Sequence, residues 1–290
     1  MVHDFKYVVI TPVRDEEKYI EATIESVSGQ TILPAEWIIV DDGSTDRTGK
    51  ILDAAAVRLP WIRVVHRPNR GFRKSGGGVV DAFYDGYNVL QSDDWEFLVK
   101  LDGDLSLSPE YFEKCFEHFT RQSRLGIGGG VICHNMDGEL RLEANPRFHV
   151  RGATKIYKRA CWEEIGGLWR GPGWDTIDEV QANMFGWTTT SFQELRLLHH
   201  RFTGSEDGAV RDRVKHGVAC YISRYHLLFV VSSCLYRLLQ KPYVIGSAAM
   251  FYGFLKGYFA HVPRVNDRRY VRYMHAQQMR RLCGLESIWK

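Results

Sequence analysis

Several familiar signals are missing from this sequence, and each absence removes a class of protein. No Cys-x-x-Cys pair and no zinc-finger spacing occurs among the six cysteines, Cys115, Cys133, Cys161, Cys220, Cys234 and Cys283. We therefore expect reduced thiols, no zinc site and a cytoplasmic setting. The chain also lacks a lysine-rich block and has a formal net charge of only +3, so nothing favours a nucleic acid partner. The first residues, MVHDFKYVVITP, do not have the form of a secretory signal.

Apolar residues are plentiful. The 290 residues are 44% hydrophobic, which is enough for one large domain or for one domain with a C-terminal extension. Strands are expected in KYVVITP, EWIIVDD, IRVVHR and WEFLVKLDGD, and helices in DEEKYIEATIESVSGQ, TDRTGKILDAAAVRL, SGGGVVDAFYDGYNVLQ and SPEYFEKCFEHFTRQ, the last capped by Ser108. This alternation predicts an α/β fold with a mostly parallel, doubly wound sheet and helices on both faces.

Two pairs of acidic residues stand at the ends of expected strands. Asp41 and Asp42 end the second strand, and Asp102 and Asp104, in LDGD, end the fourth. Ligands of doubly wound sheets bind at the carboxyl ends of the strands, so both pairs should face one crevice. Four carboxylates there would repel one another unless a cation or the hydrogen-bond donors of a ligand compensate them. Because Mg²⁺ or Mn²⁺ completes its shell with phosphate oxygens, the pattern points to a nucleoside diphosphate.

Two glycine-rich segments are candidates for anion-binding loops. RPNRGFRKSGGG places Arg70, Arg73 and Lys74 before a helix start whose free N–H groups could receive an anionic oxygen. A solvated basic loop explains the same residues, and the Gly-Lys-Ser/Thr ending of a P-loop is absent. GIGGG, residues 126–130, follows a helix and precedes an apolar run, the reverse of a dinucleotide fingerprint, so we attribute it to close backbone packing.

Taken together, VVITPVRDEEKYIEATIESVSGQ, EWIIVDDGSTDRT, NRG and FLVKLDGD resemble the nucleotide-sugar-binding half of family-2 inverting glycosyltransferases, which have the GT-A fold. The resemblance extends from the N-terminus to about residue 190. It implies that the nucleotide sugar contacts Pro12, Val13, Asp15, Glu16, Asp41, Asp42, Asn69, Arg70, Lys74, Asp102 and Gly103. It also implies that Asp102 and Asp104 hold Mg²⁺ or Mn²⁺, with a late histidine, His199 or His200, as a further ligand. A purely structural histidine at a strand end is the alternative for each.

The same family places its catalytic base in an acidic pair near the start of a helix that ends in Gly-Trp. GWDTIDEVQANMFGW fits this description and puts Asp175 at that position. Trp174 stands where the family usually has Glu, so Asp178 and Glu179 remain rivals, and helix capping is the alternative for each acid. We expect a base of modestly raised pKa, with Trp174 as its apolar wall. The processive Gln-x-x-Arg-Trp signature is not matched, which favours the addition of single sugars.

The last part of the chain has a different character. We expect a GT-A domain over residues 1–200, with a nucleotide-sugar half over about 1–105 and an acceptor half over about 106–200, and a helical, aromatic-rich region over 201–290. ACYISRYHLLFVVSSCLYRLL and PYVIGSAAMFYGFLKGYFAHV contain too many charged residues to span a membrane. These helices either pack as ordinary core or rest peripherally on the cytoplasmic membrane face, helped by Arg264, Arg268, Arg269, Arg272, Arg280 and Arg281.

The leading hypothesis is a metal-dependent enzyme that moves one sugar from a nucleoside-diphosphate sugar to a glycan or lipid-linked acceptor, in cell-surface glycan or glycolipid synthesis. A magnesium-dependent phosphatase or phosphotransferase, with Asp102 as nucleophile and Asp104 as acid, is one alternative. Enzymes of that class usually carry the motif on their first strand, whereas here it follows the fourth. A non-catalytic sugar-nucleotide-binding or membrane scaffold protein is the other alternative.

Overall fold

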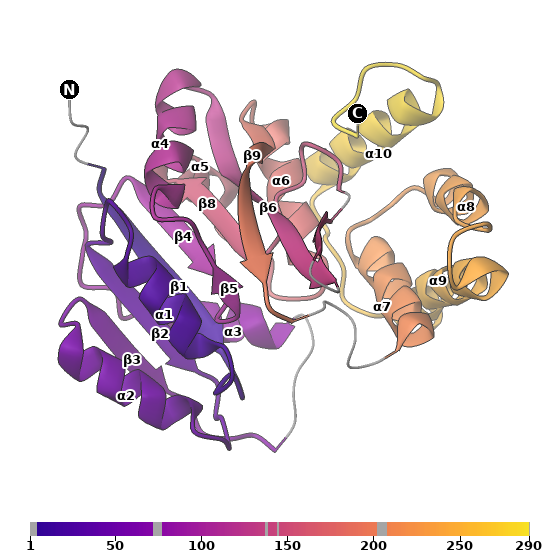
Figure 1. Ribbon diagram of the computed structural model, residues 1–290. Helices are drawn as coiled ribbons and strands as arrows, with labels where there is room; N and C mark the ends of the chain where they lie inside the picture. The colour runs from indigo at the N-terminus through magenta and orange to yellow at the C-terminus, as the bar shows by residue number, and fades with distance from the viewer. Residues whose placement is uncertain (1–4, 72–76, 137–138, 144, 202–207, 290) are drawn as a thin grey trace.

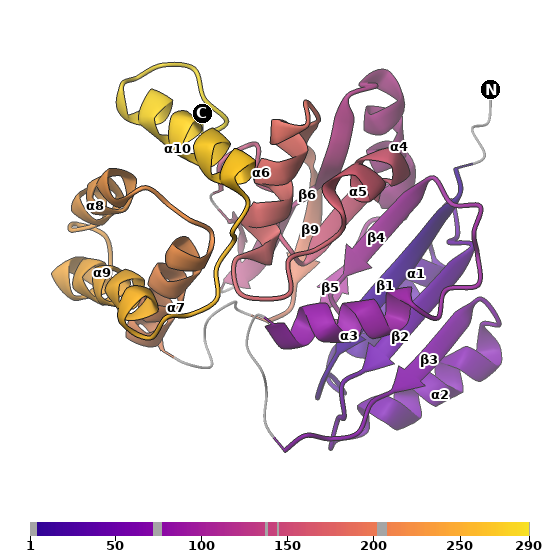
Figure 2. The same cartoon turned by 180° about the vertical axis from the view of Figure 1, so that it is seen from behind.

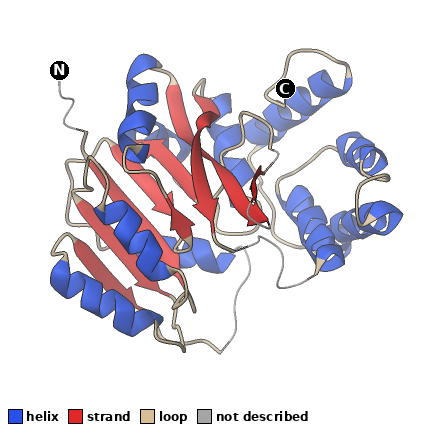
Figure 3. Cartoon of the chain, viewed as in Figure 1, coloured by secondary structure: helices blue, strands red, loops and turns tan. Residues whose placement is uncertain are grey.

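The computed structural model describes residues 5–71, 77–136, 139–143, 145–201 and 208–289. A single sheet flanked by helices forms most of the molecule, and the part that follows the last strand is entirely helical among the described residues (Figures 1 and 3). The strands are β1 (Tyr7–Val13), β2 (Glu36–Asp41), β3 (Ile62–His66), β4 (Phe97–Leu101), β5 (Leu105–Ser106), β6 (Leu125–Met136), β7 (Glu139–Leu142), β8 (Thr154–Lys158) and β9 (Thr188–His199).

The sheet combines a parallel half and a mixed half. Its order is β3-β2-β1-β4-β8-β6-β9-β5, with β7 paired to β6. β3, β2, β1 and β4 are all parallel, as the strand-helix alternation predicts. β8 runs antiparallel to both β4 and β6, whereas β9 is parallel to β6. The mostly parallel arrangement therefore holds for the first four strands, and the mixed half continues the same sheet.

Helices cover both faces of the sheet. α1 (Ile20–Ser28), α2 (Thr48–Arg58) and α4 (Tyr111–Arg121) lie on the face turned to the viewer in Figure 1. α3 (Gly77–Tyr87), α5 (Arg159–Ile165) and α6 (Trp174–Met184) lie on the other face, which Figure 2 shows. Two expected boundaries were wrong. α1 begins at Ile20, because the residues before it form a loop, and Glu110 precedes α4 without any side-chain cap, so Ser108 is not its capping residue.

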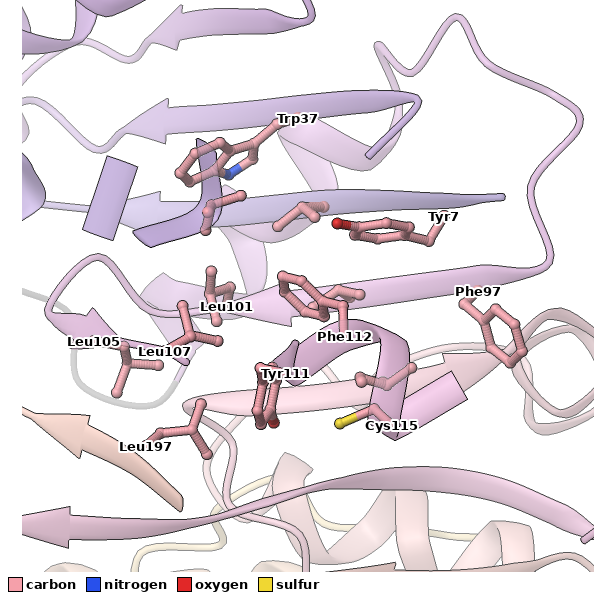
Figure 4. Packing of buried hydrophobic residues seen from close by; sticks show 14 of the residues in the cluster. Tyr7, Trp37, Phe97, Leu101, Leu105, Leu107, Tyr111, Phe112, Cys115 and Leu197 are labelled. Atoms are coloured by element: carbon pink, nitrogen blue, oxygen red, sulfur yellow. The ribbon is translucent and has the colours of Figure 1, made fainter. Parts of the chain in front are cut away.

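The strands of the parallel half are buried on both sides, since side chains alternate between the two faces. Tyr7 and Val9 of β1 belong to the cluster under α1 and α4, whereas Val8 and Ile10 belong to the cluster under α3. Figure 4 shows the first cluster, where the rings of Tyr7 and Phe112 lie 5.0 Å apart between centroids. The continuous apolar runs of the sequence are thus explained by burial on two faces.

The C-terminal region consists of α7 (Ala209–Ile222), α8 (Leu227–Tyr236), α9 (Tyr243–Phe259) and α10 (Arg268–Leu282). α7 and α9 cross closely, because a Cβ atom on Gly217 would overlap the backbone of Met250, and one on Gly253 would overlap that of Val214. The region shares an apolar cluster with Ile177 and Val180 of α6. Within the described ranges, no helix is long and apolar enough to cross a membrane.

The GIGGG segment lies at the start of β6, where close packing excludes side chains. A Cβ atom on Gly129 would overlap the carbonyl oxygen of Thr154, and one on Gly130 would overlap that of Leu195. The attribution of these glycines to backbone packing is therefore confirmed.

We predict that Gly129→Ala lowers the free energy of unfolding by about 1–3 kcal/mol, because the methyl group would have to displace backbone atoms. Urea denaturation measures this difference. Gly29→Ala is the matched control, since φ is −89° there and a Cβ atom would stand 3.3 Å from its nearest neighbour, the oxygen of Glu25. Equal stability of the two variants would contradict the packing explanation.

Candidate active site

The carboxyl ends of β1, β2 and β4 lie at one edge of the sheet, because these strands are parallel neighbours. Pro12 and Val13, the last residues of β1, pair with Val40 and Asp41 of β2. The two acidic pairs that the sequence places after β2 and β4 therefore stand at the same edge, as expected. This edge is the candidate donor site.

Asp41 is engaged by the chain itself. Its Oδ1 accepts a hydrogen bond from the backbone N–H of Ser44 at 2.8 Å, and its Oδ2 lies 3.0 Å from Nδ1 of His66. The other ring nitrogen of His66 lies 3.0 Å from Asp53. Hydrogen bonds to Asp53 and Asp41 raise the pKa of His66, so this imidazole supplies a positive charge to Asp41 over a wider pH range than a free histidine.

Asp42 is compensated by two arginines from the segment after β3. Arg67 and Arg70 both contact its carboxylate, and Nη1 of Arg70 lies 2.7 Å from Oδ1. We expected these acids to need a foreign cation or a ligand. That expectation was wrong for Asp41 and Asp42, because side chains that are distant in sequence provide the compensating charge.

The loops after β1 and β2 are tied together by the predicted donor-site residues. Oδ1 of Asp15 accepts a hydrogen bond from the backbone N–H of Thr45 at 2.7 Å, and the N–H of Asp15 donates to Oγ of Ser44 at 2.9 Å. The N–H of Glu16 donates to Oγ1 of Thr48, the first residue of α2, at 2.8 Å. Asp15 and Glu16, which we expected at the start of α1, therefore belong to the loop before that helix.

Asn69 organises the loop that follows β3. Its Oδ1 accepts hydrogen bonds from Nη2 of Arg14 at 2.9 Å and from the backbone of Gly71 at 2.8 Å. The structure therefore brings Asn69 to the end of β1, where Arg14 lies. Lys74, the remaining predicted donor-site residue, and its neighbour Arg73 lie outside the described residues.

The Asp-Gly-Asp turn packs against the end of β1. A Cβ atom on Gly103 would stand 2.5 Å from Cγ1 of Val13, so a side chain at this position would push the turn away. Asp102 is partly exposed and contacts Nζ of Lys100. Asp104 is buried, and its Oδ2 lies 3.1 Å from Nε2 of His199. The turn thus presents one exposed and one buried carboxylate.

The side chains of Arg201 and His199 lie beside Asp104, whereas that of His200 contacts Ser106. Nε of Arg201 lies 3.8 Å from Asp104, and its Nη2 contacts Glu16. Burial pushes the pKa of Asp104 upward, but His199 and Arg201 outweigh it and hold that pKa below its usual value. Nε2 of His200 instead lies 2.8 Å from Oγ of Ser106. Of the two candidate histidines, His199 is the one beside the turn.

Asp104 and His199 fit a metal ion whose remaining ligands would come from water and a nucleotide. Within the described residues, no three His, Cys, Asp or Glu side chains are arranged to hold a metal ion by themselves. Asp104 and His199 are nevertheless adjacent, and Nδ1 of His199 is buried with no hydrogen-bond partner among the residues that the structure describes. Mg²⁺ or Mn²⁺ commonly takes only one or two protein ligands and completes its shell with water and phosphate oxygens.

Asp178 and Glu179, the rival bases, belong to a buried ion cluster. Nζ of Lys155 lies 2.8 Å from Oδ1 of Asp178 and 2.9 Å from Oε1 of Glu179, and all three side chains are inaccessible to solvent. Tyr157 donates to Asp178 at 2.6 Å, and His149 lies 2.9 Å from Glu179. Burial raises the pKa of Asp178 to about 6. An acceptor cannot reach these acids, so the geometry favours a structural role for both.

Asp175 stands in the first turn of α6, beside the donor site. The backbone N–H of Asp102 donates to the oxygen of Ala153 at 2.8 Å. On the preceding residue, Gly152, a Cβ atom would lie 3.5 Å from Cβ of Asp175. The residue that caps α6 is Gly173, so none of the three acids occupies that position. Of the three acids, Asp175 is the half-buried one, and it packs against Gly152, the neighbour of the residue that accepts the hydrogen bond from Asp102.

The expectation that the pKa of Asp175 is raised was wrong. Burial pushes the pKa upward, but the positive charges of His149, Lys155 and Arg151 more than offset it, and the pKa lies below its ordinary value. Trp174 does not form a purely apolar wall either. Its ring centroid lies 5.5 Å from Nζ of Lys155 and equally far from Nζ of Lys100.

Lys100 and Lys155 are the site residues that sequence reasoning missed. They are direct partners across β4 and β8, and both are almost fully buried. The available signal was a lysine inside an otherwise apolar strand segment, in FLVKLD and in ATKIY. Such a lysine is costly to bury without a carboxylate partner, so it indicates an ion pair.

Comparisons with known proteins identify the family and the fold. Residues 8–171 match the family model described as glycosyl transferase family 2. The chain is 34% identical over 157 residues to glycosyltransferase GlyG of Streptococcus pneumoniae, a match that covers 54% of this chain and 48% of that protein, so the chain spans about half the length of this relative. It is 32% identical over 267 residues to an undecaprenyl-phosphate 4-deoxy-4-formamido-L-arabinose transferase of Serratia proteamaculans, which covers 86% of this chain and 74% of that protein.

The fold also has solved counterparts. The mannosyltransferase PcManGT from Pyrobaculum calidifontis, in complex with GDP-Man and Mn²⁺, superposes with a TM-score of 0.57 at 15% identity, covering 97% of this chain and 76% of that one. At that identity the likeness shows the fold alone. The phosphatase alternative gains nothing from these matches. From the family match and the fold together, the chain belongs to glycosyl transferase family 2 and has the GT-A architecture.

Proposed function

We propose that this chain is a metal-dependent, inverting glycosyltransferase that adds single sugars, with Asp175 as its catalytic base. The observation that carries the proposal is the position of Asp175 against Gly152, next to the residue that hydrogen-bonds Asp102. This position supports a base close to the turn that would hold the donor diphosphate. A base and a leaving group must both border the anomeric carbon for a single displacement to occur.

On the donor side, Asp104 and His199 would hold Mg²⁺ or Mn²⁺, with Asp102 beside them. When bound, the ion supplies positive charge to the departing diphosphate. Arg201 lies next to Asp104 and carries a second positive charge at this position. The relative positions of Asp15, Asn69 and Arg70 support a nucleoside pocket between the loops after β1, β2 and β3. Because PcManGT was crystallised with GDP-Man and Mn²⁺, a nucleoside-diphosphate sugar is the donor class that we propose.

On the acceptor side, Asp175 takes the proton of the attacking hydroxyl. The acceptor oxygen forms a bond to the anomeric carbon while the bond from that carbon to the diphosphate oxygen breaks on the opposite face. The configuration is therefore inverted in one step. The low pKa of Asp175 keeps the carboxylate ionised and ready to accept the proton at neutral pH.

A lipid-linked or glycan acceptor, in cell-surface glycan or glycolipid synthesis on the cytoplasmic side, completes the proposal. It is supported by the similarity to the Serratia protein, whose name pairs undecaprenyl phosphate with a sugar transferase. The alternative of a non-catalytic scaffold protein is separated from this one by the following experiment.

We predict that Asp175→Asn lowers kcat by about 10²–10⁴-fold and leaves the affinity for the nucleotide sugar unchanged, since only the proton acceptor is lost. Asp178→Asn is the matched control from the same helix. It should lower the free energy of unfolding by about 1–3 kcal/mol, because it disturbs a buried hydrogen-bonded group, and should keep most of kcat. Transfer assays and urea denaturation measure the two effects. A transferase in which Asp178→Asn is the dead variant would refute the assignment.

Turnover should stay constant as the pH falls from 8 to about 5. The pKa of Asp175 is below the ordinary aspartate value of about 3.9, so the base stays ionised over this range. The acid limb of the kcat profile should appear only below about pH 4, with circular dichroism confirming that the protein is folded. An acid limb near pH 6 would instead favour a base with a raised pKa.

Mn²⁺ should tighten the binding of a nucleoside diphosphate, and Asp104→Asn should remove most of that gain. The reason is that the ion and the diphosphate share ligands, so each stabilises the binding of the other. Thermal-shift titrations with uridine and guanosine diphosphates, with Mn²⁺ or with EDTA, measure the effect. Asp94→Asn, which changes an exposed carboxylate paired with Lys6 just before β1, is the control. If the unchanged protein binds the nucleotide equally well with Mn²⁺ and with EDTA, the metal has no place in the proposal.

A further inference from the structure

The turn between α8 and α9 carries a concentration of exposed apolar side chains. Each is between 54% and 88% exposed, and they are Leu235, Tyr236, Leu239, Tyr243, Val244 and Ile245. We call these six residues the apolar tip. Figures 1 and 2 show α8 and α9 at the end of the molecule opposite α2 and β3. Large exposed apolar patches of this kind mark contact surfaces.

The exposed apolar surface continues along α9. Ile245, Tyr252 and Phe259 follow one another at intervals of seven residues, which is two helical turns, and they are 64%, 59% and 81% exposed. The opposite side of the helix, with Met250 and Phe254, is buried in the cluster shared with α6. α9 therefore has one face packed against the protein and another turned outward.

The charge around the apolar tip has one sign. Residues 213–266 contain seven Lys and Arg residues and no Asp or Glu. Over residues 209–290 there are fourteen basic and three acidic residues, so the remaining part of the chain is net acidic although the total is +3. Within the turn itself stand Arg237 and Lys241, the latter exposed. A surface that joins apolar side chains, tyrosines and basic residues is complementary to the interface of an anionic bilayer.

We propose that the apolar tip inserts into the headgroup region of an anionic lipid bilayer and holds the protein at its surface. The tip supplies apolar side chains for the acyl boundary, its tyrosines suit the interface, and Arg237 and Lys241 meet the lipid phosphates. A second copy of the chain is a poorer partner, because it would bring one basic surface against another. The proposal goes beyond the transfer reaction and does not depend on it.

Five of the six arginines named in the sequence analysis belong to α10 and are not part of the apolar tip. Arg268, Arg269, Arg272, Arg280 and Arg281 belong to α10, which packs against α6 and α8. The guanidinium of Arg264 lies over the rings of Tyr221 and Tyr258, at 4.8 and 5.2 Å from their centroids. The residues next to the apolar tip are therefore Arg237 and Lys241.

Flotation with vesicles tests the proposal on the full chain. The unchanged protein should float with vesicles of phosphatidylcholine containing about a third phosphatidylglycerol, and should stay at the bottom with phosphatidylcholine alone. The double variant Leu235→Ser, Leu239→Ser should lower the partition coefficient by about tenfold or more, because two apolar side chains are lost from the interface. Lys241→Glu should weaken binding mainly at low ionic strength.

The matched control is Val57→Ser on α2, at the opposite end of the molecule, where the side chain is 85% exposed. It removes an equally exposed apolar group and should not change flotation. Circular dichroism and binding of a nucleoside diphosphate with Mn²⁺, both measured without vesicles, show whether each variant is folded. These readouts separate the two proposals, since nucleotide binding can fail while flotation persists, or the reverse.

Three results would overturn the membrane proposal. The unchanged protein could remain at the bottom with anionic vesicles at low salt. The double tip variant could float as well as the Val57→Ser control. Light scattering could show that the tip variants lower the molecular mass of an oligomer while vesicle binding is unaffected, in which case the apolar tip binds a second copy of the chain.

Discussion

The pairing of β8 with β4 is the constraint on which the rest of the structure depends. β8 enters the sheet antiparallel to β4, with Thr154 opposite Leu101. The backbone immediately before β8 therefore continues the ladder to Asp102. This one strand joins the parallel half to the mixed half and brings Trp174 of α6 near Lys100 of β4. Both the Asp-Gly-Asp turn and the candidate base are held in place by this pairing.

A buried ion cluster around Lys155 holds the same region in place. Lys155 on β8 is surrounded by Asp178, Glu179 and the backbone oxygen of Asp175, which Nζ contacts at 2.5 Å. Such a cluster tolerates little displacement, because any separation would leave an uncompensated charge inside the protein. The first turn of α6 is thus attached to the strand that borders the donor site. Lys155 therefore contributes to the low pKa of Asp175 and also holds its backbone in position.

Local sequence was sufficient for the parallel half of the fold. Apolar runs ending in Asp41, His66 and Asp102 identified the strands and the functional edge, because period and turn residues are properties of short segments. The sequence predicts no strands in the mixed half, since β8 and β9 find their partners only in the folded sheet. In the site, the resemblance placed Asp175 and the Asp-Gly-Asp turn together. The compensation of Asp42 by Arg67 and Arg70, and the burial of Asp178, depend on contacts between distant segments and could not be read from spacing.

The crossing of α7 and α9 has a mechanical consequence. At Gly217 and Gly253 the two backbones touch with no side chain between them, and such a contact leaves no room for one helix to pivot on the other. The α8–α9 hairpin is thereby held against α7 and, through the shared apolar cluster, against α6. A protein bound to a bilayer through this hairpin would keep Asp175 at a set height above the lipid. The length of an acceptor's stem, as well as the chemistry of its hydroxyl, would then decide which molecules are glycosylated.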